Sequence, residues 1–115
     1  MGTEKLVDCI ISGMEEKKGN DISILNLSKL DYAITKYFII CDANSQIQVE
    51  AIANSIEDKT QKNLKEKVWK KDGYTNGIWI LLDYVDVVVH IFQKKYRDFY
   101  DLEGLWSEAE IKNIN

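Results

Sequence analysis

Apolar side chains recur at helical spacing near the start of the chain. Over residues 4–18 the stripe consists of Leu6, Val7, Ile10, Ile11 and Met14. This spacing predicts an amphipathic helix with one buried face. Gly19-Asn20 follows and predicts the end of the helix, because both residue types adopt the left-handed conformation readily.

Two further stretches have helical character. Residues 44–63 begin with Ser45, and Gln48 follows three residues later, a capping box that predicts a helix start. The expected buried stripe of this helix is Val49, Ile52, Ala53 and Ile56. Residues 96–111 have a weaker pattern, interrupted by Gly104, of Leu102, Leu105, Trp106 and Ala109. We expect a helix in each stretch.

Strand patterns fill much of the remaining chain. Residues 21–27, DISILNL, alternate with a period of two. In the next run, YFIICD, residues 37–41 are apolar on both faces. The first pattern predicts a strand with two different faces, and the second a central strand covered on both sides. Residues 67–77 predict a short, charged edge strand with turns at Asp72-Gly73 and Asn76-Gly77.

The run IWILLDYVDVVVHIF, residues 78–92, predicts two apolar strands joined as a hairpin near Asp83 to Asp86. The turn is poorly encoded, because neither Tyr84 nor Val85 favours positive φ. Together the patterns predict a single α/β domain over residues 1–115, with about five strands and about three helices.

Composition narrows the class of protein. With 45% hydrophobic and 30% charged residues, the chain is typical of a globular domain. Its net charge of -4 disfavours binding to nucleic acid by phosphate neutralisation and favours a basic protein partner. No apolar run approaches the ~18 residues that span a bilayer, and no charged-then-apolar leader opens the chain. We therefore expect a cytoplasmic protein without membrane contact.

The spacing of the cysteines and the absence of nucleotide-binding motifs both argue against a bound metal or cofactor. Cys9 and Cys41 lie among apolar neighbours without CxxC spacing, so we expect buried thiols rather than a disulfide or a metal pair. Neither the glycine-rich dinucleotide motif nor the P-loop motif occurs. We expect no cofactor and no metal.

Three aspartates carry the strongest catalytic hypothesis. Asp42, Asp83 and Asp86 flank apolar strands, in the general layout of nucleotidyltransferases, whose carboxylates hold metal ions. Two carboxylates share a strand face only at i, i+2 spacing, whereas Asp83 and Asp86 are three residues apart. We therefore favour turn-forming aspartates. A residual nucleotide-binding enzyme, with phosphate at the helix start near Ser45, stays open as an alternative.

His90, the only histidine, shares a strand face with Val88 and Phe92, while Val87 and Val89 lie on a purely apolar face. An imidazole can act as an acid or base, but one histidine makes no metal site by itself. No serine or cysteine has a recognisable nucleophile signature. We expect a structural or interface histidine and no catalytic residue.

Aromatic and charged side chains are interleaved near the end of the chain, where the aromatic residues are Phe92, Tyr96, Phe99, Tyr100 and Trp106. Aromatic side chains are common anchors of protein interfaces. Those outside the core, together with Trp79 and the aspartates, are therefore candidates for a surface that binds a basic protein.

Three segments, YFIICDANSQIQVEAIANSIE, GIWILLDYVDVVVHIF and YRDFYDLEGLW, carry a resemblance to a known family. Over residues 4–109 the chain closely resembles the Iojap/RsfS family of ribosomal silencing factors. The most specific matches are Trp79, Asp83, the strand from Asp86 to His90, Arg97, and Tyr100 to Trp106. The chain departs from the family pattern at Lys36, at Asp42-Ala43, and at Val85, which replaces a turn glycine.

The resemblance implies a nucleotidyltransferase-like α/β fold with a mixed sheet and no catalytic function. It also implies binding to the large ribosomal subunit through a ribosomal protein at the subunit interface. Such binding blocks joining of the small subunit and represses translation when nutrients run short. A role in large-subunit assembly stays open, and so does homodimer formation. The residues expected to bind the partner are Trp79, Asp83, Asp86, His90, Arg97, Tyr100 and Glu103.

Overall fold

The computed structural model describes residues 2–114 and contains, over that range, one six-stranded mixed sheet. In chain order the strands are β1 (Asn20–Asn26), β2 (Tyr37–Ala43), β3 (Lys70–Asp72), β4 (Trp79–Asp83), β5 (Val87–Gln93) and β6 (Glu110–Asn113). Across the sheet their order is β3-β4-β5-β2-β1-β6. The β2 and β5 strands are parallel, and the other neighbouring pairs are antiparallel. The predicted α/β class with a mixed sheet is confirmed.

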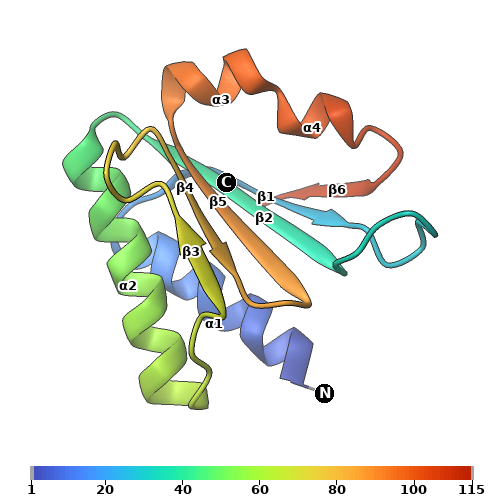
Figure 1. The fold of residues 1–115 in the computed structure, drawn as a ribbon, viewed down its shortest axis with the longest axis horizontal. Helices are drawn as coiled ribbons and strands as arrows, with labels where there is room; N and C mark the ends of the chain where they lie inside the picture. Colours follow the sequence, from blue (N-terminus) through green and yellow to red (C-terminus); the bar gives the residue numbers. More distant parts are fainter. Residues whose placement is uncertain (1, 115) are drawn as a thin grey trace.

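Helices cover the two faces of this sheet unequally. Within residues 2–114 they are α1 (Gly2–Glu16), α2 (Gln46–Leu64), α3 (Lys94–Tyr100) and α4 (Leu102–Leu105). The long helices α1 and α2 lie side by side on one face, whereas α3 and α4 cross one end of the other face (Figure 1). The main core therefore lies between α1, α2 and the sheet, where its fully buried side chains include Ile10, Met14, Ile39, Ile52, Ile56, Ile80, Val89 and Ile91.

The predicted start of the second helix is confirmed in atomic detail. Ser45 precedes α2 with extended backbone, and its hydroxyl accepts a hydrogen bond from the N–H of Gln48 at 3.1 Å. The Gln48 side chain in turn accepts from the N–H of Asn44 at 3.4 Å. These contacts satisfy N–H groups that have no partner inside the helix, which is why this sequence begins a helix here.

The predicted hairpin between β4 and β5 is also confirmed, including its unfavourable turn. Val85 has a φ of 77°, a conformation that a β-branched residue rarely adopts. The N–H of Asp86 donates to the carbonyl of Tyr84 at 3.0 Å, which closes a tight γ-type turn around Val85. The edge strand β3 is confirmed as well, and the glycines after it, Gly73 and Gly77, have positive φ as expected.

The C-terminal segment differs most from the prediction. A single helix was expected over residues 96–111, but Asp101 has a φ of 46° and separates α3 from α4. The Asp101 carboxylate accepts the N–H of Gly104 at 3.2 Å, so it caps the second short helix. The chain then forms β6, which pairs with β1 and gives the sheet a sixth strand. The prediction of one helix here was wrong because the left-handed Asp101 interrupts it and the segment after α4 pairs with β1 instead. Leu105, counted in the predicted apolar stripe, is exposed.

Both cysteines are free, as expected: Cys41 is buried and Cys9 is half-buried. Burial raises the pKa of both thiols, so neither is a reactive thiolate at neutral pH. Across residues 2–114, no helix combines the length and apolar character needed to cross a bilayer.

Candidate functional site

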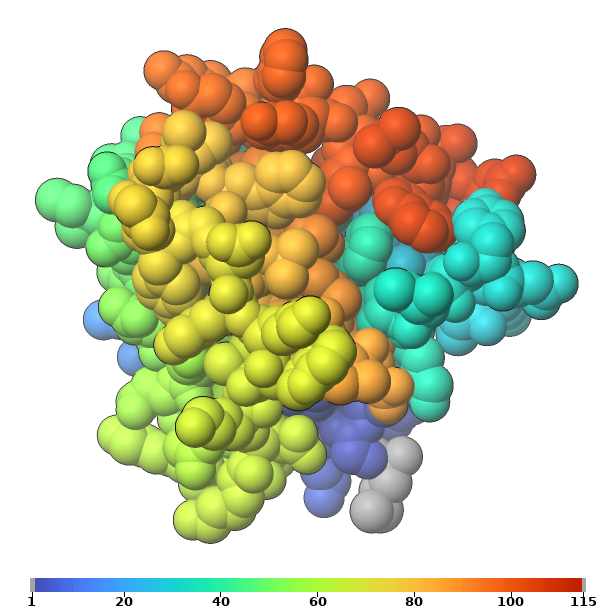
Figure 2. Space-filling view, viewed as in Figure 1, coloured from blue at the N-terminus to red at the C-terminus, as the bar shows by residue number. Residues whose placement is uncertain are grey.

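The sheet surface opposite α1 and α2 is only partly covered, and we call it the open face. Paired residues of neighbouring strands point to the same side of a sheet, and the pairing register therefore identifies its members. Figure 2 views this face, with β4 and β5 in the middle, α3 and α4 along one border, and the loop of residues 28–36 along another. The register also places Ile40, Asp42 and Phe92 on this side, but they are buried at the end next to α3. The open face is therefore defined as Phe38, Trp79, Leu81, Asp83, Val88 and His90.

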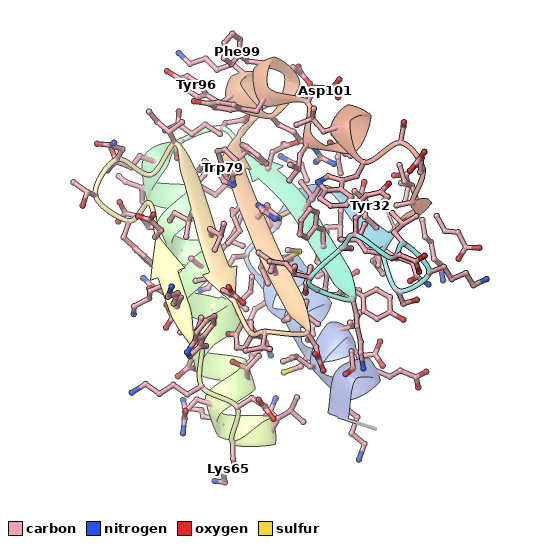
Figure 3. All side chains as sticks on the ribbon, turned by 45° about the vertical axis from the view of Figure 1, so that its right-hand side comes forward. Tyr32, Lys65, Trp79, Tyr96, Phe99 and Asp101 are labelled. Carbon is pink, nitrogen blue, oxygen red and sulfur yellow. The ribbon has the colours of Figure 1, made fainter. Side chains whose placement is uncertain are left out.

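An aromatic cluster occupies the end of the open face nearest α3. The ring of Trp79 stacks on Phe92 with 4.8 Å between centroids, and it contacts Tyr100 at 5.0 Å. Phe99 packs edge-on against Tyr100 and is mostly exposed. In Figure 3, Trp79 lies directly below the helix that carries Tyr96 and Phe99. The cluster presents the residue types that most often anchor protein interfaces.

The loop of residues 28–36 adds a second apolar border. Trp106 packs edge-on against Phe38 at 5.4 Å and stacks on Tyr32 at 5.8 Å. Tyr32 also donates a hydrogen bond to Glu108. Ile34, in the same loop, is 100% exposed. Trp106 was among the aromatic candidates from the sequence, but Tyr32, Ile34 and Phe38 were not, because Phe38 lies in a strand predicted to be buried and the loop has no periodicity.

His90 lies in the floor of the open face and is held there by Trp79. The indole Nε1 donates a hydrogen bond to His90 Nδ1 over 3.0 Å. Burial lowers the pKa of His90 to about 3, because the imidazolium would lose its hydration. The imidazole is therefore neutral at physiological pH, which argues against an acid or base role near pH 7.

Arg97 is buried where α3, β1, β2 and α4 meet. Its guanidinium donates to Asp42 at 2.9 Å, to Glu103 at 2.5 Å, to the Asp21 carbonyl at 2.7 Å, and to the Ser23 hydroxyl at 3.2 Å. Burial raises the pKa of Asp42, and the hydrogen bond from Arg97 offsets part of that rise. Arg97 and Glu103 thus form an internal ion pair that fixes the α3–α4 corner against the sheet.

The three aspartates of the catalytic hypothesis lie in separate places. Asp42 is tied to Arg97, whereas Asp83 accepts the N–H of Val85 at 2.7 Å inside the turn. Asp86 accepts a threonine hydroxyl from α1 at 3.3 Å. Each carboxylate has its own structural partner, and the preference for turn-forming aspartates is confirmed for Asp83, whereas Asp86 contacts α1 instead. Over residues 2–114, no three His, Cys, Asp or Glu side chains are grouped to hold a metal ion.

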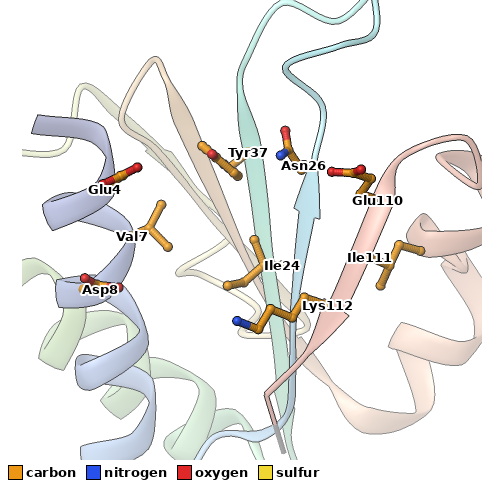
Figure 4. A pocket seen from close by; sticks show the side chains of 9 residues that line it. All are labelled: Glu4, Val7, Asp8, Ile24, Asn26, Tyr37, Glu110, Ile111 and Lys112. Carbon is orange, nitrogen blue, oxygen red and sulfur yellow. The ribbon is translucent and has the colours of Figure 1, made fainter. Parts of the chain in front are cut away.

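A pocket lies on the helix side of the sheet, between α1 and strands β2, β1 and β6 (Figure 4). Its volume is about 380 Å³, and it combines the apolar Val7 and Ile24 with the acidic Glu4, Asp8 and Glu110. In the described part of the chain, the buried side-chain atoms without a hydrogen-bond partner belong to Asp42 and His90, which both lie elsewhere. This pocket has no comparable polar feature awaiting a ligand.

The structure separates the predicted partner-binding residues into groups. Trp79, Asp83 and His90 belong to the open face, and Tyr100 borders it. The remaining three lie apart from that surface: Arg97 is buried and pairs with the half-buried Glu103, and Asp86 lies beside α1 at the hairpin turn. Whether any of the seven contacts a partner stays a prediction.

Comparisons with known proteins agree on one family. The family model RsfS, described as "Ribosomal silencing factor during starvation", matches residues 2–115. The chain is 34% identical over 115 residues to the ribosomal silencing factor RsfS of Bacillus subtilis. The alignment covers 100% of this chain and 96% of the relative. It is 42% identical over 94 residues to the chloroplastic protein Iojap of Zea mays, covering 82% of this chain and 40% of that protein.

The fold is similar to that of a solved protein of Chromobacterium violaceum, with a TM-score of 0.87 and 34% sequence identity. The similarity covers 93% of this chain and 88% of the other. Sequence and structure therefore lead to the same group of proteins.

Proposed function

The chain belongs to the RsfS family of ribosomal silencing factors, and from this premise we propose that it binds the large ribosomal subunit through the open face. The family name supports a role connected with the ribosome. The finer steps are part of the proposal: contact with a ribosomal protein at the subunit interface, exclusion of the small subunit, and repression of translation when nutrients are short.

The observation that carries the proposal is the uncovered apolar surface of the sheet. Sheet faces are normally buried against another layer, yet Leu81, Val88 and Trp79 remain partly accessible between two apolar borders. Contiguous exposed apolar patches on soluble proteins mark interaction surfaces. Aromatic residues at such a patch supply most of the binding energy when a partner excludes water from them.

Charge supports a basic protein as the partner. The chain has a net charge of -4, and Asp83 places a carboxylate on the open face itself. Acidic surfaces attract basic proteins and repel the phosphates of RNA. The open face therefore suits a basic ribosomal protein better than ribosomal RNA.

Inhibition by steric exclusion requires no chemistry from this chain. A domain that occupies an intersubunit contact needs only affinity and correct placement. The structural partners of the three aspartates fit this reading, because Asp42 is already neutralised by Arg97 and Asp83 is engaged in a turn. We therefore propose a binding protein rather than an enzyme.

Sucrose-gradient sedimentation with purified ribosomal subunits tests the proposal. The protein should migrate with free large subunits, and it should lower the yield of joined ribosomes when small subunits are added afterwards. Protein that stays at the top of the gradient at low and moderate salt, with no effect on joining, contradicts the proposal. A second run with small subunits alone serves as the control and should show no association.

A further inference from the structure

The open face contains a pocket large enough for one side chain. Its volume is about 260 Å³, below the ~300–1,000 Å³ typical of sites for small-molecule ligands. The lining combines five apolar side chains with Thr35, Asp83 and His90, and the apolar ones are Ile34, Phe38, Leu81, Val88 and Trp106. Side chains from β2, β4, β5, the 28–36 loop and the segment after α4 therefore meet around a single cavity.

His90 places an N–H donor without an acceptor in the wall of this pocket. The Trp79 indole can only donate, so His90 Nδ1 accepts its hydrogen bond and carries no proton. A neutral imidazole with an unprotonated Nδ1 has its proton on Nε2. His90 is 3% exposed, and its Nε2 has no hydrogen-bond partner among residues 2–114. The pocket wall thus holds a buried N–H donor without an acceptor.

Packing within the described part of the chain gives this donor no oxygen acceptor. The rings of Phe38 and His90 meet edge-to-face with 4.6 Å between centroids, and an aromatic ring is in any case a far weaker acceptor of an N–H than an oxygen atom. Buried donors in folded proteins are nearly always paired, so an unpaired one calls for an explanation such as an absent partner.

We propose that this pocket receives one apolar side chain of a basic protein partner on the large subunit, and that an oxygen acceptor beside that side chain takes the hydrogen bond of His90 Nε2. The wall around Nε2 must yield slightly, because this nitrogen is covered in the free chain. Asp83, in the same lining, pairs with a lysine or arginine next to the inserted side chain. This proposal rests on the proposed function and extends it, because it identifies the pocket beside His90 as the place where the partner binds.

The pocket can be filled from within to test this. Val88→Phe and Leu81→Phe each add a ring at a half-buried position that lines the cavity. Both variants should bind large subunits at least about tenfold more weakly than the parent in a pelleting assay, the loss expected when a hot-spot pocket is blocked. Ile47→Phe is the matched control, because Ile47 is exposed on α2, away from the open face, and its substitution should leave binding unchanged.

The single histidine allows a direct measurement of the donor. Because the chain contains only one histidine, ¹⁵N resonances of the imidazole report on His90 alone. The free protein at pH 7 should show a neutral ring with its proton on Nε2. A charged ring, or a ring protonated on Nδ1, overturns the proposal because no unpaired donor would then face the pocket.

The outcomes separate this inference from the proposed function. Failure of the parent protein to bind large subunits overturns both. If the parent binds and both folded filling variants bind equally well, only the pocket assignment is wrong. If the filling variants bind subunits normally but lose self-association in light scattering, the occupant is a second copy of this chain, which also overturns the proposal.

Discussion

Arg97 of α3 and Asp42 of β2 form a buried ion pair, with 2.9 Å between the guanidinium and the carboxylate, although 55 positions separate them in the chain. Their side chains are only 9% and 3% exposed. The buried charge of Asp42 therefore depends on Arg97 for compensation, while Arg97 also pairs with Glu103. Together these contacts fix the corner of α3 and α4 that borders the open face.

Removing one member of this pair should be strongly destabilising. Arg97→Met leaves Asp42 and Glu103 without their cation, and breaking a buried pair typically costs about 3–5 kcal/mol of unfolding free energy. Urea unfolding followed by circular dichroism measures the loss. The matched control is Lys62→Met, which breaks an exposed ion pair with Asp58 and should change stability by less than about 1 kcal/mol. Similar losses in the two variants would contradict the structural role of Arg97.

Stability should fall with acidification because of His90. The unfolded chain binds a proton at this residue below a pKa of about 6.5, whereas the folded chain does not until about pH 3. Between these values the unfolded state binds more protons, so stability rises with pH in that window. From pH 6.5 towards pH 4 the loss due to His90 approaches about 1.4 kcal/mol per pH unit.

The variant His90→Gln isolates this contribution, because glutamine does not titrate. Urea unfolding of parent and variant at pH 7, 6 and 5 should show a parent stability that declines more steeply than that of the variant. Parallel pH dependence in the two proteins would mean that His90 is not held neutral by burial.

The turn between β4 and β5 should become more stable when Val85 is replaced by glycine. Val85 is 54% exposed, so little apolar burial is lost, and its φ of 77° is one that glycine adopts without strain. We expect Val85→Gly to gain about 1 kcal/mol, the balance of relieved strain against the greater entropy of unfolded glycine. Val85→Ala keeps the positive φ and should gain less. Thermal unfolding compares the three proteins, and a destabilised glycine variant would refute the strain argument.

Binding to the large subunit should depend on the exposed aromatic border. Tyr100 is 43% exposed beside Trp79, so Tyr100→Ala should leave the fold intact. Its affinity for large subunits should fall at least about tenfold at any salt concentration, as for an aromatic anchor. Trp79→Ala should weaken binding too, but it also removes the hydrogen bond to His90. Ile47→Ala, on the opposite side, is the control, and circular dichroism verifies folding of each variant.

The carboxylate of Asp83 should pair with a lysine or arginine of the partner in a contact that stays open to solvent, so its contribution should depend on salt. Asp83→Asn keeps an oxygen that can accept the N–H of Val85, so the turn should persist while one negative charge is lost. Association with large subunits should slow at low ionic strength and approach the parent rate at higher salt, where charges are screened. Stopped-flow or surface-binding kinetics at several salt concentrations measures this. A salt-independent loss of affinity would instead mean that Asp83 makes a close, buried contact.

Local pattern was sufficient for most elements of the fold. The capping box at Ser45 and Gln48, the alternation in β1 and the hairpin of β4 and β5 are properties of short stretches, and each formed as predicted. The segment after Tyr100 was predicted wrongly, because its course depends on contacts outside itself: the left-handed Asp101 and the pairing of β6 with β1. Strand pairing between distant segments leaves no periodic signal in either one.

The sequence by itself determined the family, the elements before residue 94 and the separation of β5 into two faces, because side chains alternate along a strand whatever lies around it. Only the tertiary structure decided which of those faces is covered. With α1 and α2 both packed against Val87, Val89 and Ile91, the opposite face is left to the short α3 and α4. On that opposite face His90 is buried and accepts a hydrogen bond from Trp79, and Arg97 of α3 pairs with Asp42. Burial of a polar group depends on the whole arrangement of helices, and no local pattern encodes it.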